Sequence, residues 1–88
     1  MTIKVQVRYF ASLREALGSG EAVEIDPVAP ASVGALRDAL IARGGAHAEK
    51  LARGRAVRIA LDQQLCDDEA APLRDGAEIA FFPPVTGG

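Results

Sequence analysis

The sequence predicts an α+β fold in which a mixed β-sheet packs against one main helix. Three observations support this. The first ten residues alternate apolar and polar side chains with period two, with Phe10 the odd member of the polar face. A helical apolar stripe follows in residues 32–43, and alternating segments return at 57–62 and 78–82. Strands on both sides of one amphipathic helix are typical of a sheet covered on a single face.

The N-terminal region predicts a strand, a short helix and a second strand. One face of the first strand carries Ile3, Val5, Val7 and Tyr9, and the other carries Lys4, Gln6, Arg8 and Phe10. The segment "ASLREALG" predicts a helical turn from Ala11, with Leu13 and Leu17 on one side and Gly18 ending it. The segment "EAVEID" predicts a strand with Val23 and Ile25 pointing inward.

The main helix is expected to begin at Ser32, a favourable N-cap, and to run through "VGALRDALIAR". Its apolar stripe consists of Val33, Leu36, Leu40 and Ile41. Gly34 weakens the first turns, and Gly44 and Gly45 are expected to end the helix. The following residues, 46–55, could form another helical turn, and the sequence leaves this open.

The second half predicts three more extended segments. In "AVRIALD", Val57, Ile59 and Leu61 share one side. The segment "DQQL" indicates a tight connection into a short strand that contains Leu65. Asp75 and Gly76 predict a turn before a last strand, in which Ile79 and Phe81 face one way and Glu78, Ala80 and Phe82 face the other. This order of elements suits a β-grasp arrangement, with a domain at residues 1–82 and an extended tail at 83–88.

The sheet face opposite the helix carries the first candidate binding residues. Phe10 and Phe82 both belong to this face, and Leu65 lies beside the tight turn. If the first and last strands are parallel neighbours, the two rings lie close together. Such a cluster suggests a protein contact, although the same side chains could simply cover the sheet edge.

Composition excludes several classes of function. The chain has 88 residues and a net charge of −2, with its basic residues scattered, which does not suggest nucleic acid or an anionic membrane as a partner. One cysteine, Cys66, cannot form an internal disulfide, and one histidine, His47, leaves no ligand set for a metal. We expect His47 to be a solvated surface residue and Cys66 a half-buried apolar one. Without an apolar signal segment or membrane span, a reduced, cytoplasmic setting is expected.

The C-terminal segment "FFPPVTGG" is the second candidate site. Pro83 and Pro84 favour an extended polyproline conformation, which would project the tail away from the sheet. Val85 and Thr86 provide side chains to grip, whereas Gly87 and Gly88 have no Cβ and fit a narrow pocket. The segment therefore suits insertion of a backbone carboxylate into another protein. An ATP-using partner could convert that carboxylate to an acyl-adenylate, which a sulfur or nitrogen nucleophile could attack.

Beyond the tail, the chain carries no recognisable catalytic grouping, phosphate loop or metal cluster. Apart from the carboxyl end, the sequence therefore offers no catalytic set of its own.

These segments resemble the family of small subunits of molybdopterin synthase, which are ubiquitin-like sulfur-carrier proteins. The resemblance is carried by "DGAEIAFFPPVTGG", "VRYFASLREALG", "SVGALRDAL" and "LDQQL", and it extends over the whole chain. Ala77 stands where members often have an acid, and Asp62 where an Asn is common. Neither departure involves the tail.

The resemblance implies a role in molybdenum cofactor biosynthesis. A separate adenylyltransferase would use ATP to adenylate Gly88, and sulfur would then replace the adenylate to give a thiocarboxylate. The tail would deliver this sulfur to cyclic pyranopterin monophosphate in the large synthase subunit, within a heterotetramer. Phe10, Leu65 and Phe82 fall where the family contacts its partners, and no cofactor is expected to bind this chain.

Three alternatives stay open. The chain could be a sulfur carrier of the same fold for thiamine or cysteine synthesis, although the Phe-Phe-Pro-Pro approach favours the molybdopterin branch. It could be a protein modifier joined through Gly88 to a lysine of a target, because the chemistry up to the adenylate is identical. It could also be an interaction module with an idle tail.

Overall fold

The computed structural model of the chain describes residues 2–26, 31–52, 54, 56–66 and 68–84. Along these ranges the elements are β1 (Ile3–Tyr9), α1 (Ala11–Leu17), β2 (Gly20–Ile25), α2 (Val33–Ile41), α3 (Gly45–Leu51), β3 (Arg58–Leu61), β4 (Gln64–Leu65) and β5 (Glu78–Phe82). The five strands form one sheet in the order β2-β1-β5-β3-β4. Strands β1 and β5 are parallel, whereas the other neighbouring pairs are antiparallel, so the sheet is mixed as predicted.

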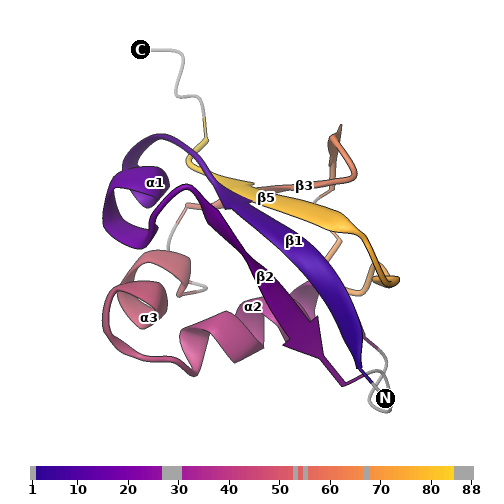
Figure 1. Ribbon diagram of the computed structural model, residues 1–88. Coiled ribbons are helices and arrows are strands. Elements are labelled where there is room, and N and C mark those ends of the chain that lie inside the picture. The colour runs from indigo at the N-terminus through magenta and orange to yellow at the C-terminus, as the bar shows by residue number, and fades with distance from the viewer. Residues whose placement is uncertain (1, 27–30, 53, 55, 67, 85–88) are drawn as a thin grey trace.

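The helices cover one face of this sheet. Helices α2 and α3 lie beneath the strands, and α1 packs at the end where β1 finishes (Figure 1). The core between the layers consists of the inward residues of the strands and the buried stripes of the helices. Its fully buried members include Val5, Val7, Tyr9, Val33, Leu36, Leu40, Leu51, Ile79 and Phe81. The period-two and helical patterns of the sequence therefore predict most of this core, whereas Leu51 comes from the segment that the sequence left open and Ile41 of the predicted stripe is only partly buried.

Helix α2 begins where the sequence predicts and ends slightly earlier. The Ser32 hydroxyl oxygen accepts a hydrogen bond from the backbone N–H of Ala35 at 3.1 Å, as an N-cap does. The loop at 68–73 accepts from two further N–H groups of the first turn, those of Val33 and Gly34. A Cβ at Gly34 would lie 3.1 Å from the Glu69 carbonyl oxygen, so glycine lets this loop approach the helix closely. The helical residues end at Ile41, before the predicted Arg43.

The segment that the sequence left open is helical. Gly44, with φ 76°, interrupts the helical conformation after α2. Gly45 was expected to end the main helix, but it is the first residue of α3. Leu51 at the end of α3 is completely buried, and its burial explains why this short helix packs against the core.

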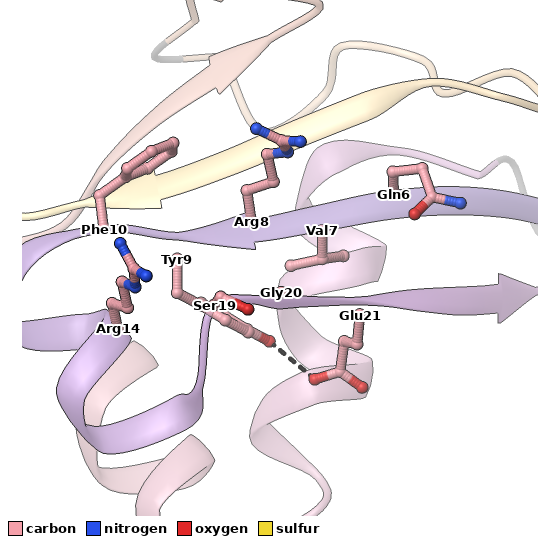
Figure 2. Close-up of a pocket in the computed structure, with 9 residues that line it drawn as sticks. All are labelled: Gln6, Val7, Arg8, Tyr9, Phe10, Arg14, Ser19, Gly20 and Glu21. Atoms are coloured by element: carbon pink, nitrogen blue, oxygen red, sulfur yellow. Dashed lines mark hydrogen bonds between the residues drawn. The ribbon is translucent and has the colours of Figure 1, made fainter.

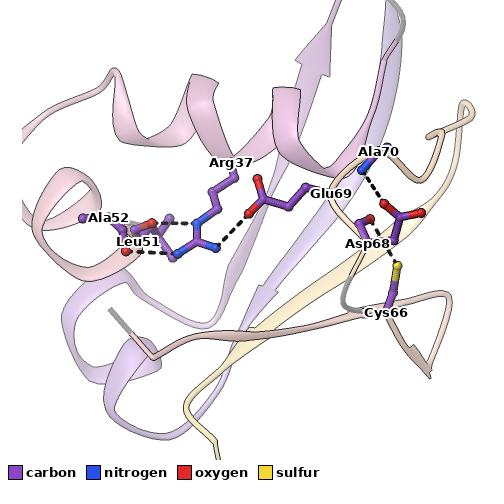
Figure 3. A network of polar contacts seen from close by, with 7 residues as sticks. All are labelled: Arg37, Leu51, Ala52, Cys66, Asp68, Glu69 and Ala70. Atoms are coloured by element: carbon purple, nitrogen blue, oxygen red, sulfur yellow. Dashed lines mark hydrogen bonds and ion pairs between the residues drawn. The ribbon is translucent and has the colours of Figure 1, made fainter. Parts of the chain in front are cut away.

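A buried arginine joins the two helices to each other (Figure 3). The Arg37 side chain on α2 donates to the Leu51 carbonyl at 2.7 Å and to the Ala52 carbonyl at 3.0 Å. It also forms an ion pair with Glu69 at 3.4 Å. The carbonyl oxygens at the C-terminal end of α3 thus accept hydrogen bonds from Arg37, because the helix itself has no N–H donors for them.

The tight connection between β3 and β4 is a two-residue turn. Asp62 and Gln63 have φ values of 50° and 70°. Two successive residues with positive φ are typical of the tight turns that connect twisted antiparallel strands. The N–H and carbonyl of Glu78 bond to the Asp62 carboxylate and N–H at 3.0 and 2.8 Å. Asp62 therefore occupies the turn position at which the resembling family commonly has Asn. Its hydrogen bonds to Glu78 attach the turn to β5.

Candidate functional site

The open face of the sheet carries the side chains that point away from the helices. Because β1 and β5 are parallel with Tyr9 opposite Phe81, the outward residues Arg8 and Ala80 lie side by side. On the other side of β5, Ala80 is opposite Ala60, and Ala60 is opposite Leu65. One row across the sheet therefore reads Arg8, Ala80, Ala60, Leu65.

The predicted contact residues lie on or beside this face. Phe10 is 43% exposed and Leu65 is 60% exposed, and in the described part of the chain these are the two exposed large hydrophobic side chains. Phe82 is half-buried, whereas its neighbour Phe81 is fully buried in the core. The Phe10 N–H donates to the Phe81 carbonyl at 3.1 Å, so Phe10 directly adjoins β5.

The parallel pairing needed to bring Phe10 and Phe82 together is present. The two rings nevertheless make no ring–ring contact in the ranges that the structure describes. They occupy neighbouring strand ends as two separate apolar side chains, with Leu65 at the opposite side of the sheet.

The base of the C-terminal segment is included in the described chain. Pro83 and Pro84 follow β5 directly, are half-buried, and line a hollow of about 350 Å³ together with Leu13, Lys50 and Val57. The remaining predicted site residues, Val85, Thr86, Gly87 and Gly88, lie outside the described residues. The division between a domain at 1–82 and a tail at 83–88 stays a prediction.

A second hollow, of about 430 Å³, lies at the outer edge of the sheet where α1 leads into β2 (Figure 2). Arg8 and Phe10 stand on the same side of β1 there, and Arg14 of α1 lies beside Phe10 (Figure 2). Ser19 and Gly20 also line this hollow. Of these residues, the sequence pointed to Phe10 alone. It gave no signal for the two arginines, because their neighbours in the hollow come from three different elements.

A cluster around Glu21 lies on the helix side of the same strands. The Glu21 carboxylate accepts from the Tyr9 hydroxyl at 3.1 Å and pairs with Arg43 and with His47, the latter at 3.4 Å. His47 also packs edge-on against the Tyr9 ring. The expectation of a solvated His47 is therefore wrong: α3, which the sequence left open, carries this side chain to a partly buried carboxylate.

The pKa values of two side chains in this cluster, Tyr9 and Glu21, are shifted from their ordinary values. Burial and the neighbouring negative charge of Glu21 raise the pKa of the Tyr9 hydroxyl well above its ordinary value. Burial alone would raise the pKa of Glu21, but hydrogen bonds from Arg43 and Tyr9 outweigh it and leave that pKa below the ordinary value. Both shifts favour a neutral tyrosine bonded to an ionised glutamate.

Catalytic chemistry has little support in the part of the chain that the structure describes. That part contains no group of three or more His, Cys, Asp or Glu side chains able to hold a metal ion. The half-buried Cys66 thiol donates to the Asp68 carbonyl at 3.6 Å, which agrees with its predicted structural role (Figure 3). None of the helices in the described ranges is long and apolar enough to cross a membrane.

The sequence matches the profile of the ThiS family over residues 7–88. The chain belongs to the ThiS family. Two curated members of similar length lie close to it in sequence. The molybdopterin synthase sulfur carrier subunit of Escherichia coli K12 is 40% identical over 84 residues, covering 96% of this chain and 99% of the relative. That of Haemophilus influenzae is 40% identical over 85 residues, with the same coverage. These relatives confirm the predicted sulfur carrier family and its non-catalytic, small-subunit character.

Solved structures related to this ThiS-family chain agree with the fold. One chain in the complex of subunits 1 and 2 of molybdopterin-converting factor from Helicobacter pylori has a TM-score of 0.69 and 28% identity, covering 98% of this chain and 100% of that one. Small archaeal modifier protein 1 of Haloferax volcanii has a TM-score of 0.68 and 25% identity, covering 94% and 99%. Ubiquitin of Caldiarchaeum subterraneum, 17% identical, covers 100% of both chains at a TM-score of 0.62 and confirms the ubiquitin-like β-grasp fold.

Proposed function

We propose that this chain is the sulfur carrier subunit of a molybdopterin synthase and that it carries sulfur on the carboxyl group of Gly88. The observation that supports this most directly is spatial: β5 joins an exposed apolar face to the C-terminal segment. Phe10 and Phe82 lie at the neighbouring ends of β1 and β5, and Pro83 and Pro84 continue from β5. A partner that binds the face thereby receives the C-terminal segment.

The proposed cycle begins at the Gly88 carboxylate. A separate ATP-dependent enzyme activates it: the carboxylate attacks the α-phosphate of ATP, which releases pyrophosphate and gives an acyl-adenylate. A sulfur nucleophile at the oxidation level of sulfide then displaces AMP, which leaves a thiocarboxylate. This chain contributes the acyl group, and ATP binds to the activating enzyme rather than to it.

Glycine suits both steps of this cycle. Gly87 and Gly88 lack a Cβ, so the walls of a partner's active site can approach the backbone closely. An unbranched α-carbon also leaves the acyl carbonyl open to attack. Pro83 and Pro84 restrict the chain just before this segment, which lowers the entropy lost when a partner binds it.

The acceptor in the proposed cycle is the large synthase subunit with bound cyclic pyranopterin monophosphate. Two deliveries of sulfur would build the dithiolene, within a heterotetramer of two small and two large subunits. The likeness to a chain in the Helicobacter pylori complex of subunits 1 and 2 supports a partner of this kind. The requirement for ATP and reduced sulfur fits a cytoplasmic protein.

A protein-modifier function is the second candidate, and one observation favours it. Small archaeal modifier protein 1 resembles this chain over nearly its whole length. Conjugation would use the same adenylate but would end in an amide bond between Gly88 and a lysine of a target. The 40% identity to two sulfur carrier subunits favours the carrier.

The experiment that separates the two functions is intact-mass measurement of the chain purified from cells that make the cofactor. We expect a subpopulation heavier by one oxygen-to-sulfur exchange. Deletion of Gly88, or addition of one residue after it, should abolish both this species and cofactor synthesis while the circular dichroism spectrum stays unchanged. A ladder of covalent conjugates without a thiocarboxylate would instead establish the modifier function.

A further inference from the structure

The hollow of about 350 Å³ at the end of β5 is lined by residues from three separate parts of the domain. Leu13 comes from α1, Lys50 from α3, and Val57 immediately precedes β3. Pro83 and Pro84, which follow β5, line the same hollow and are half-buried. We call Leu13, Lys50 and Val57 the proline seat.

The register between β3 and β5 explains why Val57 lies beside the prolines. These antiparallel strands pair Arg58 with Phe82. Continued by one residue, the same register puts Val57 opposite Pro83. Val57 is half-buried and packs against the core, so this part of the seat is held in place by the domain.

The start of α1 is also fixed at the end of β5, and the two elements lie next to each other in Figure 1. The Phe10 N–H donates to the Phe81 carbonyl at 3.1 Å, and Leu13 is buried. Between them, Ala11 has φ 53°, a left-handed value that residues with a Cβ rarely adopt. Such a conformation persists only where the surrounding contacts impose it. The fold therefore keeps Leu13 beside the prolines in spite of local backbone strain.

Pro83 and Pro84 form a stiff unit. Each ring fixes its own φ near −65°, and each proline restricts the residue before it to extended values of ψ. In this chain the residues restricted in that way are Phe82 and Pro83. A stiff segment keeps one direction relative to the domain only when its base is held, and the proline seat borders that base.

We propose that the proline seat holds Pro83 and Pro84 in the direction in which the C-terminal segment enters a partner's active site, and that Val57 and Lys50 are positioning residues for the reactions at Gly88. This inference rests on the proposed function. A segment that is already held in its bound direction loses less conformational entropy when a partner binds it. The seat thereby strengthens binding of the segment without itself contacting the partner.

The first test combines a change in the seat with removal of the residues beyond it. Val57→Ala is made in the intact chain and in a chain that ends at Pro84, and the dissociation constant for the large synthase subunit is measured with and without the substitution. We expect about fivefold weaker binding of the intact chain and a change of less than about twofold in the shortened chain, because only the intact chain has a segment to direct. Val57→Ile keeps a β-branched side chain against the prolines and should bind like the wild type.

Ile25→Ala is the matched control for lost packing. Ile25 is half-buried against the core but pairs with Ile3, at the end of β1 far from the prolines. It should change the dissociation constants of both chains by less than about twofold. At position 50, Lys50→Met keeps a long apolar stem without the charge and should bind like the wild type, whereas Lys50→Ala should reproduce the effect of Val57→Ala.

The second test needs no partner. In NMR spectra of the free, full-length chain, nuclear Overhauser cross-peaks should connect the Val57 methyl groups with ring protons of Pro83 or Pro84. These cross-peaks should weaken in Lys50→Ala, while those between the stacked rings of Tyr9 and Phe81 in the core stay unchanged.

The other results each contradict a specific part of the inference. Equal weakening of the intact and shortened chains by Val57→Ala would show that Val57 contacts the partner itself. Stronger binding of the intact variant would show that the prolines must leave the seat. Either result overturns the inference, as does an unchanged affinity of both chains or the absence of the cross-peaks in the wild type. If the cross-peaks are present but the wild-type chain neither carries a thiocarboxylate in cells nor binds the large subunit, the proposed function fails instead.

Discussion

Glu21 connects the edge of the sheet to the helices. Its carboxylate lies on β2 and binds Tyr9 of β1, Arg43 after α2 and His47 of α3. Four segments far apart in sequence therefore meet at one negative charge, which is partly shielded from water. An interaction of this kind is worth more than a surface ion pair because its hydrogen bonds are made to a group already half-removed from solvent.

The first prediction concerns acid stability. Because the pKa of Glu21 is lowered in the folded state, its contribution is fully present above the ordinary glutamate pKa of about 4.3. It is lost as the pH falls through the lower pKa of the folded protein. Urea unfolding between about pH 6 and pH 3 should therefore show a smaller loss of unfolding free energy in Glu21→Gln than in the wild type.

Glu24→Gln is the matched control for this experiment. Glu24 lies on the same strand, is exposed, and should leave the pH dependence of unfolding unchanged. Parallel pH profiles for the wild type and Glu21→Gln would show that the ionised carboxylate does not stabilise the fold.

The second prediction concerns Gly20 at the start of β2. A Cβ placed there would lie 2.5 Å from the Val7 carbonyl oxygen, a backbone atom that cannot move without disturbing β1. We expect Gly20→Ala to lower the unfolding free energy by about 2 kcal/mol, measured by urea denaturation. In Gly54→Ala the new methyl group meets no atom within 4 Å, so this variant should be nearly neutral. Equal effects of the two substitutions would contradict the close approach of the strands.

At the scale of elements, α3 depends on a side chain of another helix. The helix has seven residues, too few to be stable alone, and neither its N-cap nor its first turn supplies a capping side chain or an acid. Arg37 of α2 supplies the missing partners by donating to carbonyls at its C-terminal end (Figure 3). The burial of Leu51 adds the apolar contribution.

The third prediction follows from this arrangement. Arg37→Ala should lower the unfolding free energy by about 2–4 kcal/mol, because buried carbonyls lose their donors and Glu69 loses its ion-pair partner. Arg37→Lys should recover only part of the loss, since an ammonium cannot reproduce the planar fork. Hydrogen exchange of the α3 amides should accelerate more than that of β1. The control is Arg74→Ala, whose exposed side chain should contribute less than about 1 kcal/mol; a loss as large as that of Arg37→Ala would contradict the assigned role.

At the scale of the whole molecule, the two faces of one sheet have separate tasks. The side chains of Tyr9, Ile79 and Phe81 point into the core. The alternate residues along the same two strands point to the open face. Stability therefore depends on one set of side chains, and the proposed partner binding depends on the other. A carrier needs this separation, because its binding face and C-terminal segment must fit several partners without weakening the fold.

The fourth prediction tests the proposed division between domain and tail. Removal of residues 83–88 should change the unfolding free energy by less than about 1 kcal/mol, because Pro83 and Pro84, the part of this segment that the structure describes, contact the domain at half-buried positions. The same truncation should abolish sulfur transfer. Calorimetry of the truncated and intact chains provides the measurement, and a large drop in the unfolding midpoint would place the C-terminal segment within the folded unit.

Much of the architecture was predictable because the signals are local. The alternation along β1 and β5, the Ser32 cap and the Asp75-Gly76 turn each depend on residues adjacent in the chain, so their geometry follows from a few side chains. The segment at 46–55 was not predictable in this way. Its helix is stabilised by Arg37 and by burial of Leu51, contacts that reach it from a distant part of the sequence.

The same distinction between local signals and long-range contacts applies to the candidate site. The sequence by itself determined the face of Phe10 and Phe82, the proline-glycine segment and the sulfur carrier family, since parity and motifs need no knowledge of which strands are neighbours. Only the tertiary structure decided that Arg8, Ala80, Ala60 and Leu65 form one row, that Arg14 joins Phe10 at its edge, and that His47 reaches Glu21. Those arrangements depend on strand order and register, which arise from the packing of the whole chain around one core.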